Sequence, residues 1–277
     1  MIAISSQARM FDALASARRI DAAVYLPAPD FTRALAAAAR RGAAVTLHVP
    51  GTMPEGSQRA RGLEARVREL RAAGVQVTEE RERIEHLKAV VVDGREAYLA
   101  DRNFARDETL VRTDEAGAVE AAIAGAPAAS DDLVLAGKAG AQELETQLVR
   151  AAPAGSEVFV VSEYANYSPL VRELLARAGE LHERVIVGIG GVGKPLEHKA
   201  LEALAAHGVD VEIARIAEKG VCVGDCAVVT SANATVGQPS MSEWAARFDG
   251  AQAQAVRAHL IAAVAKGSAR KLDQMLE

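Results

Sequence analysis

Short apolar runs alternate along the chain with segments whose apolar residues recur at helical spacing. Residues 20–26 and 44–49 are short and rich in aliphatic side chains, which is typical of buried strands. Residues 30–41 repeat alanine and leucine with a helical period and stop at Gly42, a residue that favours a helix end. Strands that alternate with helices indicate an α/β protein whose parallel strands are buried on both faces.

The same succession of elements starts again near residue 131. Residues 70–77 and 204–211 share the pattern Leu-x-Ala-x-Gly-Val-x-Val, and one shift of 130 positions places Asn103 on Asn233. A repeat of this length indicates two copies of one folding unit.

The repeat predicts the domain organisation. We expect a first unit at residues 1–126 and a second at residues 127–239, each a mostly parallel sheet flanked by helices. Residues 240–277 have no counterpart at the end of the first copy. Their apolar positions suit one face of a helix, so a helical extension packed on the body is expected.

Composition and charge limit the classes of protein. With 277 residues, 50% of them hydrophobic, the chain can bury a core of ordinary size. Its net charge of −5 lacks the basic excess of non-specific nucleic-acid binders, which disfavours a nuclease. No apolar run reaches the length of a membrane span, and residues 1–5 lack the features of a signal peptide. A cytoplasmic protein without stable membrane insertion is therefore expected.

The two cysteines, Cys222 and Cys226, flank a predicted hairpin turn at Gly224 and Asp225. In such a hairpin the cysteines lie on different rungs of the ladder and are poorly placed for a disulfide. We expect reduced thiols here, with neither a redox pair nor a metal site.

Polar residues that suit phosphate gather around another predicted hairpin. His86 and Lys88 occupy alternate positions at the start of a valine-rich strand, so their side chains share one face. Asp93 and Gly94 form the turn, and Asn103 follows the second strand back at the same end. A neutral imidazole is a good nucleophile, and a neighbouring ammonium stabilises charge that develops on phosphorus.

At these residues the sequence resembles the phospholipase D superfamily, whose signature is H-x-K-x(4)-D followed, after six residues, by G-[GS]-x-N. Four residues match the signature at its own spacing: His86, Lys88, Asp93 and Asn103. Ala100 and Asp101 stand where the signature has Gly and then Gly or Ser. A carboxylate at Asp101 repels phosphate unless it faces away or pairs with Arg102.

The resemblance implies a mechanism and an architecture. It implies that His86 is the nucleophile that forms a phosphohistidine, and that Lys88 and Asn103 hold the non-bridging phosphate oxygens. Asp93 completes this catalytic set, mainly as the acid that shapes the turn. The superfamily packs two such units as a pseudo-twofold pair with one active site, and the resemblance covers most of residues 5–235.

The second copy keeps only the end of the signature, Ser231-Ala232-Asn233. In the alignment, Ile216, Glu218 and Val223 replace the histidine, the lysine and the aspartate. A one-residue bulge would restore a lysine through Lys219, but no register restores a histidine. Because the second histidine protonates the leaving group in the superfamily, the usual general acid is missing.

Three interpretations of this loss stay open. The chain uses a substitute acid, for which Glu163, Glu218 and His198 are the candidates. Alternatively, its substrate has a leaving group that needs no proton, such as an acidic phenol or pyrophosphate. The third interpretation is a relative that binds phosphate without catalysis.

A glycine-rich segment at residues 188–195 fits the phosphate-binding loop G-x(4)-G-K of nucleotide-binding proteins, except that Pro195 replaces the Ser or Thr that ligates magnesium. A flexible loop before a helix is the simpler interpretation. In a third interpretation, Lys194 adds positive charge to the phosphate pocket. The predicted substrate-binding residues are thus Ser231, Asn233, Glu218, Glu163 and Lys194.

The sequence therefore predicts an enzyme, a phospholipase D-like phosphodiesterase or a phosphatidyl or phosphoryl transferase that acts through a phosphohistidine. We expect no cofactor and no metal, because His86 and Lys88 replace what a Lewis acid would do. Phospholipid and nucleic acid are both left open as the phosphodiester substrate, and so is a homodimer. The alternatives are a metal-independent nuclease of the same superfamily and a catalytically inactive phosphate-binding or scaffold member.

Overall fold

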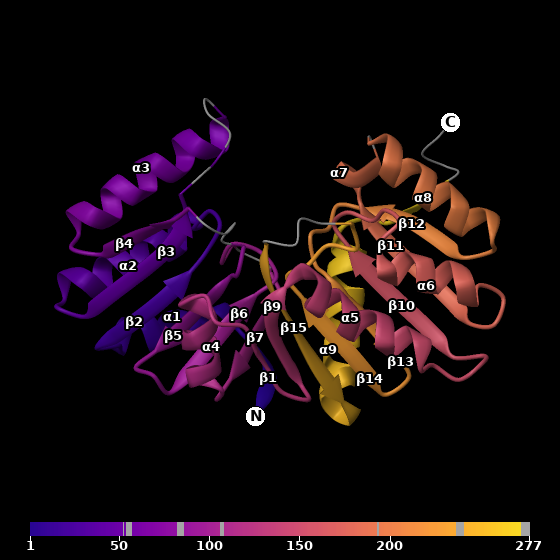
Figure 1. Cartoon of the computed structure of the whole chain (residues 1–277), viewed down its shortest axis with the longest axis horizontal. Helices are drawn as coiled ribbons and strands as arrows, with labels where there is room; N and C mark the ends of the chain where they lie inside the picture. The colour runs from indigo at the N-terminus through magenta and orange to yellow at the C-terminus, as the bar shows by residue number, and fades with distance from the viewer. Residues whose placement is uncertain are drawn as a thin grey trace. The chain divides into compact units, whose positions relative to one another are not determined.

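The structure, a computed structural model, describes residues 1–51, 53, 57–81, 86–105, 108–192, 194–236 and 241–272. The chain divides into two compact units (Figure 1). Unit 1 contains residues 1–130, 135–137 and 239–244, and unit 2 contains residues 131–134, 138–238 and 245–277. Each unit is thus assembled from segments that are not contiguous in sequence.

The described part of unit 1 forms a seven-stranded sheet with the order β1-β7-β6-β5-β2-β3-β4. The strands of this sheet are β1 (Ile2–Ser5), β2 (Arg19–Ala23), β3 (Ala44–Pro50), β4 (Gln76–Glu80), β5 (Ala89–Val92), β6 (Glu96–Ala100) and β7 (Leu110–Thr113). The helices are α1 (Gln7–Ser16), α2 (Pro29–Arg40), α3 (Gln58–Ala72) and α4 (Ala116–Ile123), and a short strand β8 (Ala128–Ala129) follows α4.

The sheet of unit 1 is mixed. Strands β2, β3 and β4 are parallel and are linked through α2 and α3, whereas the other neighbouring pairs in the described sheet are antiparallel. The predicted α/β class is confirmed, but the strands are not mostly parallel. The β5–β6 hairpin turns within residues 93–95, which is far shorter than the crossover that a parallel pair needs.

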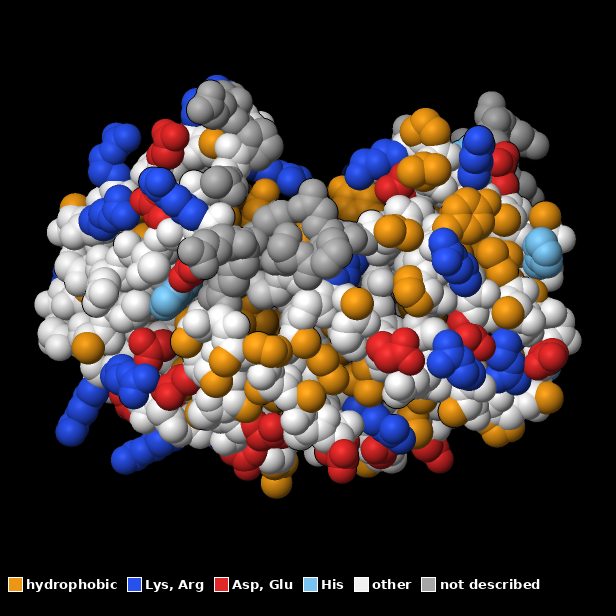
Figure 2. All heavy atoms as spheres, in the orientation of Figure 1, with side chains coloured by type: hydrophobic (Ala, Val, Ile, Leu, Met, Phe, Trp, Pro, Cys, Tyr) orange, Lys and Arg blue, Asp and Glu red, His pale blue; other side chains and the backbone are white. Residues whose placement is uncertain are grey.

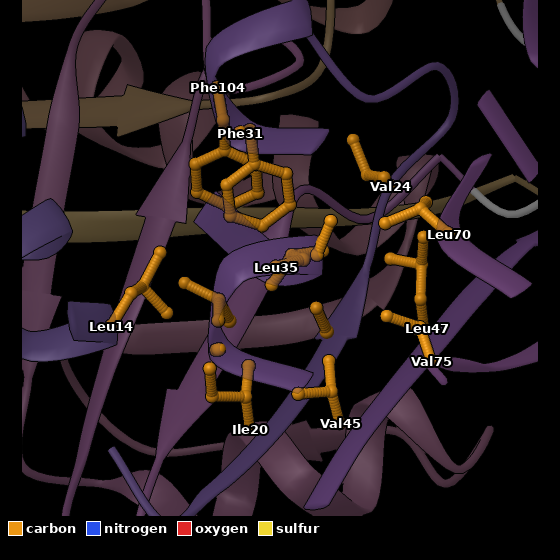
Figure 3. Packing of buried hydrophobic residues seen from close by; sticks show 14 of the residues in the cluster. Leu14, Ile20, Val24, Phe31, Leu35, Val45, Leu47, Leu70, Val75 and Phe104 are labelled. Carbon is orange, nitrogen blue, oxygen red and sulfur yellow. The ribbon is translucent and has the colours of Figure 1, made fainter. Parts of the chain in front are cut away.

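One hydrophobic core joins this sheet to its helices (Figure 3). Ile20, Val45 and Leu47 contribute to it from the strands, and Leu14 and Leu35 contribute from α1 and α2. Successive strand residues point to opposite faces, so Val90 and Val92 of β5 join this core, whereas α4 packs on β5 elsewhere in the unit. The core therefore fixes β5, the strand that follows His86 and Lys88.

Unit 2 has the strand order β16-β12-β11-β10-β13-β14-β15, and its sheet continues into β9. The strands are β9 (Leu133–Gly137), β10 (Glu157–Ser162), β11 (His182–Gly188), β12 (Asp210–Ala214), β13 (Gly220–Val223), β14 (Cys226–Thr230), β15 (Ser242–Asp249) and β16 (Arg270–Lys271). The helices are α5 (Lys138–Arg150), α6 (Pro169–Arg177), α7 (Ile189–Val192), α8 (Pro195–Ala206) and α9 (Gly250–Lys266). None of the described helices combines the length and the apolar character that a membrane span requires.

The predicted repeat is visible in the pairing of the strands. In unit 2, β10, β11 and β12 are parallel, and the antiparallel hairpin β13–β14 lies beside β10. In unit 1, β2, β3 and β4 are parallel in the same way, with the hairpin β5–β6 beside β2. The two units therefore repeat one fold.

The C-terminal segment differs from its prediction, because residues 242–249 form strand β15 and the helix starts only at Gly250. The backbone of β15 pairs with β14, with Ala245 opposite Thr230. Four consecutive residues of β15 are buried, so the strand shows no alternation of polar and apolar positions. Periodicity alone therefore could not separate this strand from the helix that follows it.

The hairpin β13–β14 has the predicted two-residue turn. Val223 pairs with Cys226 and Cys222 pairs with Ala227, so the two cysteines lie on different rungs. Both are free thiols, as expected. Burial raises the pKa of Cys222 to about 12, so this thiol stays protonated and unreactive.

Candidate active site

Three strands of unit 1 bring polar residues to one edge of its sheet. Because β5 is antiparallel to both β2 and β6, its start lies beside the ends of β2 and β6. His86 and Lys88 precede β5, Tyr25 follows β2 and Asn103 follows β6. The hairpin therefore places the predicted histidine, lysine and amide at the same edge.

The His86 imidazole contacts a carboxylate and an ammonium. Its Nδ1 is 2.8 Å from Oε1 of Glu243. Lys88 Nζ is 3.1 Å from Nε2 of the ring and 2.6 Å from Nδ1. Since a carboxylate only accepts hydrogen bonds, we assign the ring proton to Nδ1 and the lone pair to Nε2. This tautomer presents Nε2 as a nucleophile.

The three groups differ in exposure. The side chain of His86 is 20% exposed, whereas that of Lys88 is 3% exposed and that of Glu243 is 1% exposed. Lys88 Nζ lies 3.9 Å from Oε2 of Glu243, so the two buried charges compensate each other. The edge of the Tyr25 ring contacts the imidazole, with ring centroids 5.3 Å apart. The imidazole is thus the most accessible member of this trio.

Sequence analysis missed Glu243, which lies 157 positions after His86. It belongs to the part of β15 that is included in unit 1. Ser242 Oγ accepts a hydrogen bond from the backbone N–H of His86 at 3.2 Å, and the Trp244 indole donates to the Ala100 carbonyl at 2.9 Å. These contacts hold Glu243 beside the motif. Recognising residues 242–249 as a strand would have pointed to Glu243. These residues do not alternate between polar and apolar positions, so the sequence pattern did not reveal the strand.

The backbone of the β2–α2 loop holds Asn103. Its Oδ1 accepts the N–H of Leu26 at 3.1 Å, and its carbonyl accepts the N–H of Ala28 at 3.0 Å. The Nδ2 group is therefore the part of the amide that can donate to a ligand. The next residue, Phe104, stacks on Phe31 with ring centroids 4.2 Å apart, which fixes the backbone that carries the amide (Figure 3).

The two aspartates of the motif region have structural roles. Asp101 is 1% exposed and accepts a hydrogen bond from the N–H of Thr109 at 3.1 Å. Asp93 lies at the opposite end of β5 from Lys88, where its Oδ1 accepts the N–H groups of Arg19 at 2.8 Å and Arg18 at 2.9 Å. These backbone hydrogen bonds, that of Arg19 above all, hold the pKa of Asp93 below its ordinary value. Asp93 therefore shapes the turn, at the end of β5 away from Lys88.

The register of the second motif differs by one residue from the predicted alignment. In unit 1 the N–H of Ala100 donates to the carbonyl of Lys88 at 2.8 Å. In unit 2 the N–H of Thr230 donates to the carbonyl of Lys219 at 3.2 Å. Lys219 is therefore the counterpart of Lys88, and the predicted assignment of Glu218 to that position is wrong.

The turn explains this correction. The first hairpin leaves three residues between its paired strands and the second leaves two. The histidine position consequently falls on Ala217 instead of Ile216. An alignment without gaps cannot show that the second turn is one residue shorter. The second motif lacks a histidine in either register.

The corresponding edge of unit 2 keeps a lysine and an amide. Glu163 Oε2 lies 3.6 Å from Lys219 Nζ. Asn233 Oδ1 accepts the N–H of Tyr164 at 3.3 Å, a contact of the kind that holds the amide in unit 1. Glu163, Lys219 and Asn233 are thus linked at the end of β10 in a group that has no imidazole.

Three other predicted residues of unit 2 have different surroundings. Ser231 is completely buried, and Glu218 is 6% exposed with its Oε2 accepting the N–H of Ala217 at 3.0 Å. Their predicted contact with substrate stays a prediction. His198, a candidate acid, lies on α8 and pairs with Glu202 at 3.3 Å.

Lys194 is exposed, and its ammonium lies 4.3 Å from the centre of the Tyr164 ring. This cation–π contact connects Lys194 to the loop that holds Asn233. Lys194 precedes the first residue of α8, Pro195. Gly193 of the predicted phosphate loop lies outside the described residues.

Unit 1 has a further cavity of about 650 Å³ beside α3. Its walls include Val49, Leu63, Val67, Arg68 and Arg71, and its described lining contains none of the predicted site residues. Arginine side chains are prominent over α3 in Figure 2. Across the described ranges of both units, no three His, Cys, Asp or Glu side chains form a group that could hold a metal ion.

A family comparison matches an N-terminal part of the chain. Residues 10–121 match the model described as "Cardiolipin synthase, PLD-like domain", and this segment contains the whole H-x-K-x(4)-D motif. A search among curated proteins found no match.

Solved structures share the fold. Phosphatidylserine synthase from Haemophilus influenzae Rd KW20 is 11% identical, with a TM-score of 0.66 over 98% of this chain and 87% of that one. Polyphosphate kinase from Porphyromonas gingivalis is 15% identical, with a TM-score of 0.62 over 94% of this chain, which spans 49% of the kinase. Yeast tyrosyl-DNA phosphodiesterase is 12% identical, with a TM-score of 0.52 over 90% of this chain and 89% of that one. At these identities the likeness concerns the fold alone.

Proposed function

We propose that the chain is a member of the phospholipase D superfamily and acts as a phosphodiesterase or a phosphatidyl or phosphoryl transferase that uses His86 as its nucleophile. One observation carries the proposal. Glu243 engages Nδ1 of His86 at 2.8 Å, which leaves Nε2 with its lone pair on a ring that is 20% exposed.

In the proposed reaction, Nε2 of His86 attacks phosphorus and the bond to the leaving-group oxygen breaks. The ring becomes positively charged as the P–N bond forms, and the Glu243 carboxylate stabilises that charge. Lys88 and the Nδ2 group of Asn103 bind the non-bridging oxygens. Water, or an alcohol in a transferase, then attacks phosphorus and releases the imidazole.

We assign substrate binding in unit 2 to Lys219, Asn233 and Lys194. The first two occupy the positions that Lys88 and Asn103 have in unit 1. Lys194 adds an exposed ammonium beside Tyr164. Glu163 supports this group by pairing with Lys219.

A phospholipid is the substrate class that we favour. The matching family model is described as cardiolipin synthase, and phosphatidylserine synthase shares the fold over 98% of the chain. The net charge of −5 does not favour a polyanionic nucleic acid. A nuclease is the second candidate, since tyrosyl-DNA phosphodiesterase also shares the fold.

Trapping of the intermediate tests the nucleophile. After brief exposure to a phosphodiester and denaturation without acid, mass spectrometry should place the phosphoryl group on the peptide that contains His86. His86→Ala should form no adduct, whereas the control His207→Ala, at the exposed end of α8, should react normally. Equal turnover by wild type and His86→Ala ends the proposal.

A substrate screen separates the candidate functions. Bis-p-nitrophenyl phosphate, phospholipid vesicles and single-stranded DNA are compared with and without EDTA. We expect activity to persist in EDTA because the Lys88 ammonium neutralises phosphoryl charge, and its loss would contradict this mechanism. Preferred cleavage of DNA supports the nuclease. Phosphate binding without any turnover supports the inactive alternative, which Ala217 in the histidine position favours.

A further inference from the structure

A second acidic side chain lies at the edge that carries His86. Strand β7 is antiparallel to β6, so its start lies beside the end of β6 and near Asn103. The N–H of Asp101 donates to the Thr109 carbonyl at 3.2 Å, which extends this pairing to the residue next to Glu108. Neighbouring strands are about 4.8 Å apart, so Glu108 and His86, separated by β6, start roughly 10 Å apart at the backbone. The two residues therefore lie at the same edge of the sheet.

The environment of Glu108 favours a neutral carboxyl group. Its side chain is 5% exposed, and among the described residues its Oε2 has no hydrogen-bond partner. Its Oε1 receives a long hydrogen bond of 3.4 Å from the side-chain amide of Gln7, and a backbone hydrogen bond with Ala105 favours the charged form. Burial, and then the charge of Asp101, raises the pKa of Glu108 to about 8, while Arg102 acts in the opposite direction. Glu108 therefore holds a proton at neutral pH.

The repeat relates Glu108 to Glu243. Leu110 pairs with Ala100 in unit 1, and Ala245 pairs with Thr230 in unit 2. Each glutamate lies two residues before its paired strand residue, so the two occupy corresponding positions. Glu243 engages the histidine of the first motif, but the second motif has Ala217 in the histidine position. By this correspondence the histidine expected for Glu108 is that of the second motif, where Ala217 stands instead.

We propose that the carboxyl group of Glu108 protonates the leaving-group oxygen in place of the missing second histidine. This inference rests on the proposed function. When His86 Nε2 forms its bond to phosphorus, the electron pair of the breaking P–O bond takes the proton of Glu108. In the second step, the Glu108 carboxylate removes a proton from the attacking water, the P–N bond breaks, and its electron pair returns to His86. The acid is regenerated and no further reactant is needed.

Glu108→Gln tests the proposal with substrates that differ in leaving group. An amide has the size of the neutral carboxyl group but donates no proton in catalysis. Bis-p-nitrophenyl phosphate releases a phenolate that needs little protonation, whereas phosphatidylglycerol vesicles release an alkoxide. We expect the turnover of phosphatidylglycerol to fall by about a hundredfold or more, and that of the aryl ester to change by less than about threefold. Equal losses on both substrates, or no loss on either, overturn the proposal.

Controls separate this inference from the proposed function. Glu64→Gln, at an exposed position of α3, is the matched variant and should behave as wild type. If turnover depends on His86 but Glu108→Gln affects both substrates equally, only the proposed role of Glu108 is contradicted. If wild type forms no phosphohistidine and turns over neither substrate, the proposed function falls and this inference with it.

The pH profile supplies a second readout. Turnover of the alkyl substrate should fall as the pH rises through the pKa of Glu108, because the carboxylate has no proton to give. Asp101→Asn removes a negative charge that raises the pKa of Glu108, whereas Arg102 and Gln7, which lower this pKa, are unchanged. The decrease in turnover should therefore occur at lower pH. An infrared titration that shows Glu108 ionised below about pH 5 overturns the proposal even without turnover data.

Discussion

His86 takes its tautomer from Glu243, which contacts Nδ1 at 2.8 Å. An isolated imidazole carries its proton on either nitrogen, and the carboxylate selects one of them. The buried Lys88 ammonium lies 2.6 Å from Nδ1 and 3.1 Å from Nε2. At the scale of single residues, a tertiary contact therefore selects the nucleophilic atom, although the motif supplies the ring.

Glu243→Gln tests this selection. An amide can donate as well as accept and carries no charge, so it neither selects the tautomer with the proton on Nδ1 nor stabilises the positively charged ring. We expect phosphorylation of His86 to slow by about a hundredfold or more, as for other histidines oriented by a carboxylate. Rapid-quench measurements give the rate, with Glu64→Gln as control. A rate equal to that of wild type would contradict the role of the carboxylate.

The two motif hairpins differ by one residue at the turn, and this difference sets their registers. In the first hairpin Asp93 fills the longer turn and accepts hydrogen bonds from the N–H groups of Arg18 and Arg19. Asp93 has a positive φ of 52°, a conformation that aspartate tolerates better than most residues. At the scale of elements, the aspartate of the signature thus stabilises a hairpin.

Asp93→Asn should lower the free energy of unfolding at pH 7 by about 1 kcal/mol, because the amide oxygen is a weaker acceptor. The pKa of Asp93 is lowered in the folded state. Its contribution is therefore fully present above the pKa of the unfolded chain and is lost as the pH falls through the folded-state value. Urea unfolding of both proteins should show the difference at pH 7 and not near pH 2. Slower phosphorylation of His86 by the folded variant would show a catalytic role instead.

At the scale of the whole molecule, unit 1 is not a continuous stretch of sequence. It recruits residues 239–244 from beyond the second motif. Trp244 is completely buried there and donates to Ala100. A segment that matches the family over residues 10–121 therefore still lacks the carboxylate that engages its histidine.

Truncation tests this organisation. A chain that ends at residue 236 keeps the whole H-x-K-x(4)-D segment but lacks Glu243, so it should form no phosphohistidine, whereas a chain that ends at residue 272 should form it normally. Circular dichroism reports whether the shorter chain folds, and full-length Glu243→Gln reports the effect of the carboxylate alone. Phosphorylation of the shorter chain at the wild-type rate would mean that His86 acts independently of the C-terminal segment.

The α/β class, the duplication and the motif hairpin could be predicted because each depends on local pattern. Valine-rich runs and helical spacing identify the elements, and two polar residues on alternate strand positions must share a face. The strand β15 and the register of Lys219 could not be predicted in the same way. The first is buried along consecutive residues and the second depends on the length of a turn.

The sequence by itself determined which side chains stand at the start of β5 and after β6, since strand alternation and a tight turn act over a few residues. The tertiary structure alone decided that Glu243 engages His86 and that Glu108 is buried in a neutral state. Both depend on how distant strands pair and on how much water they exclude, and burial changes the charge of an acid only after the chain has folded around it.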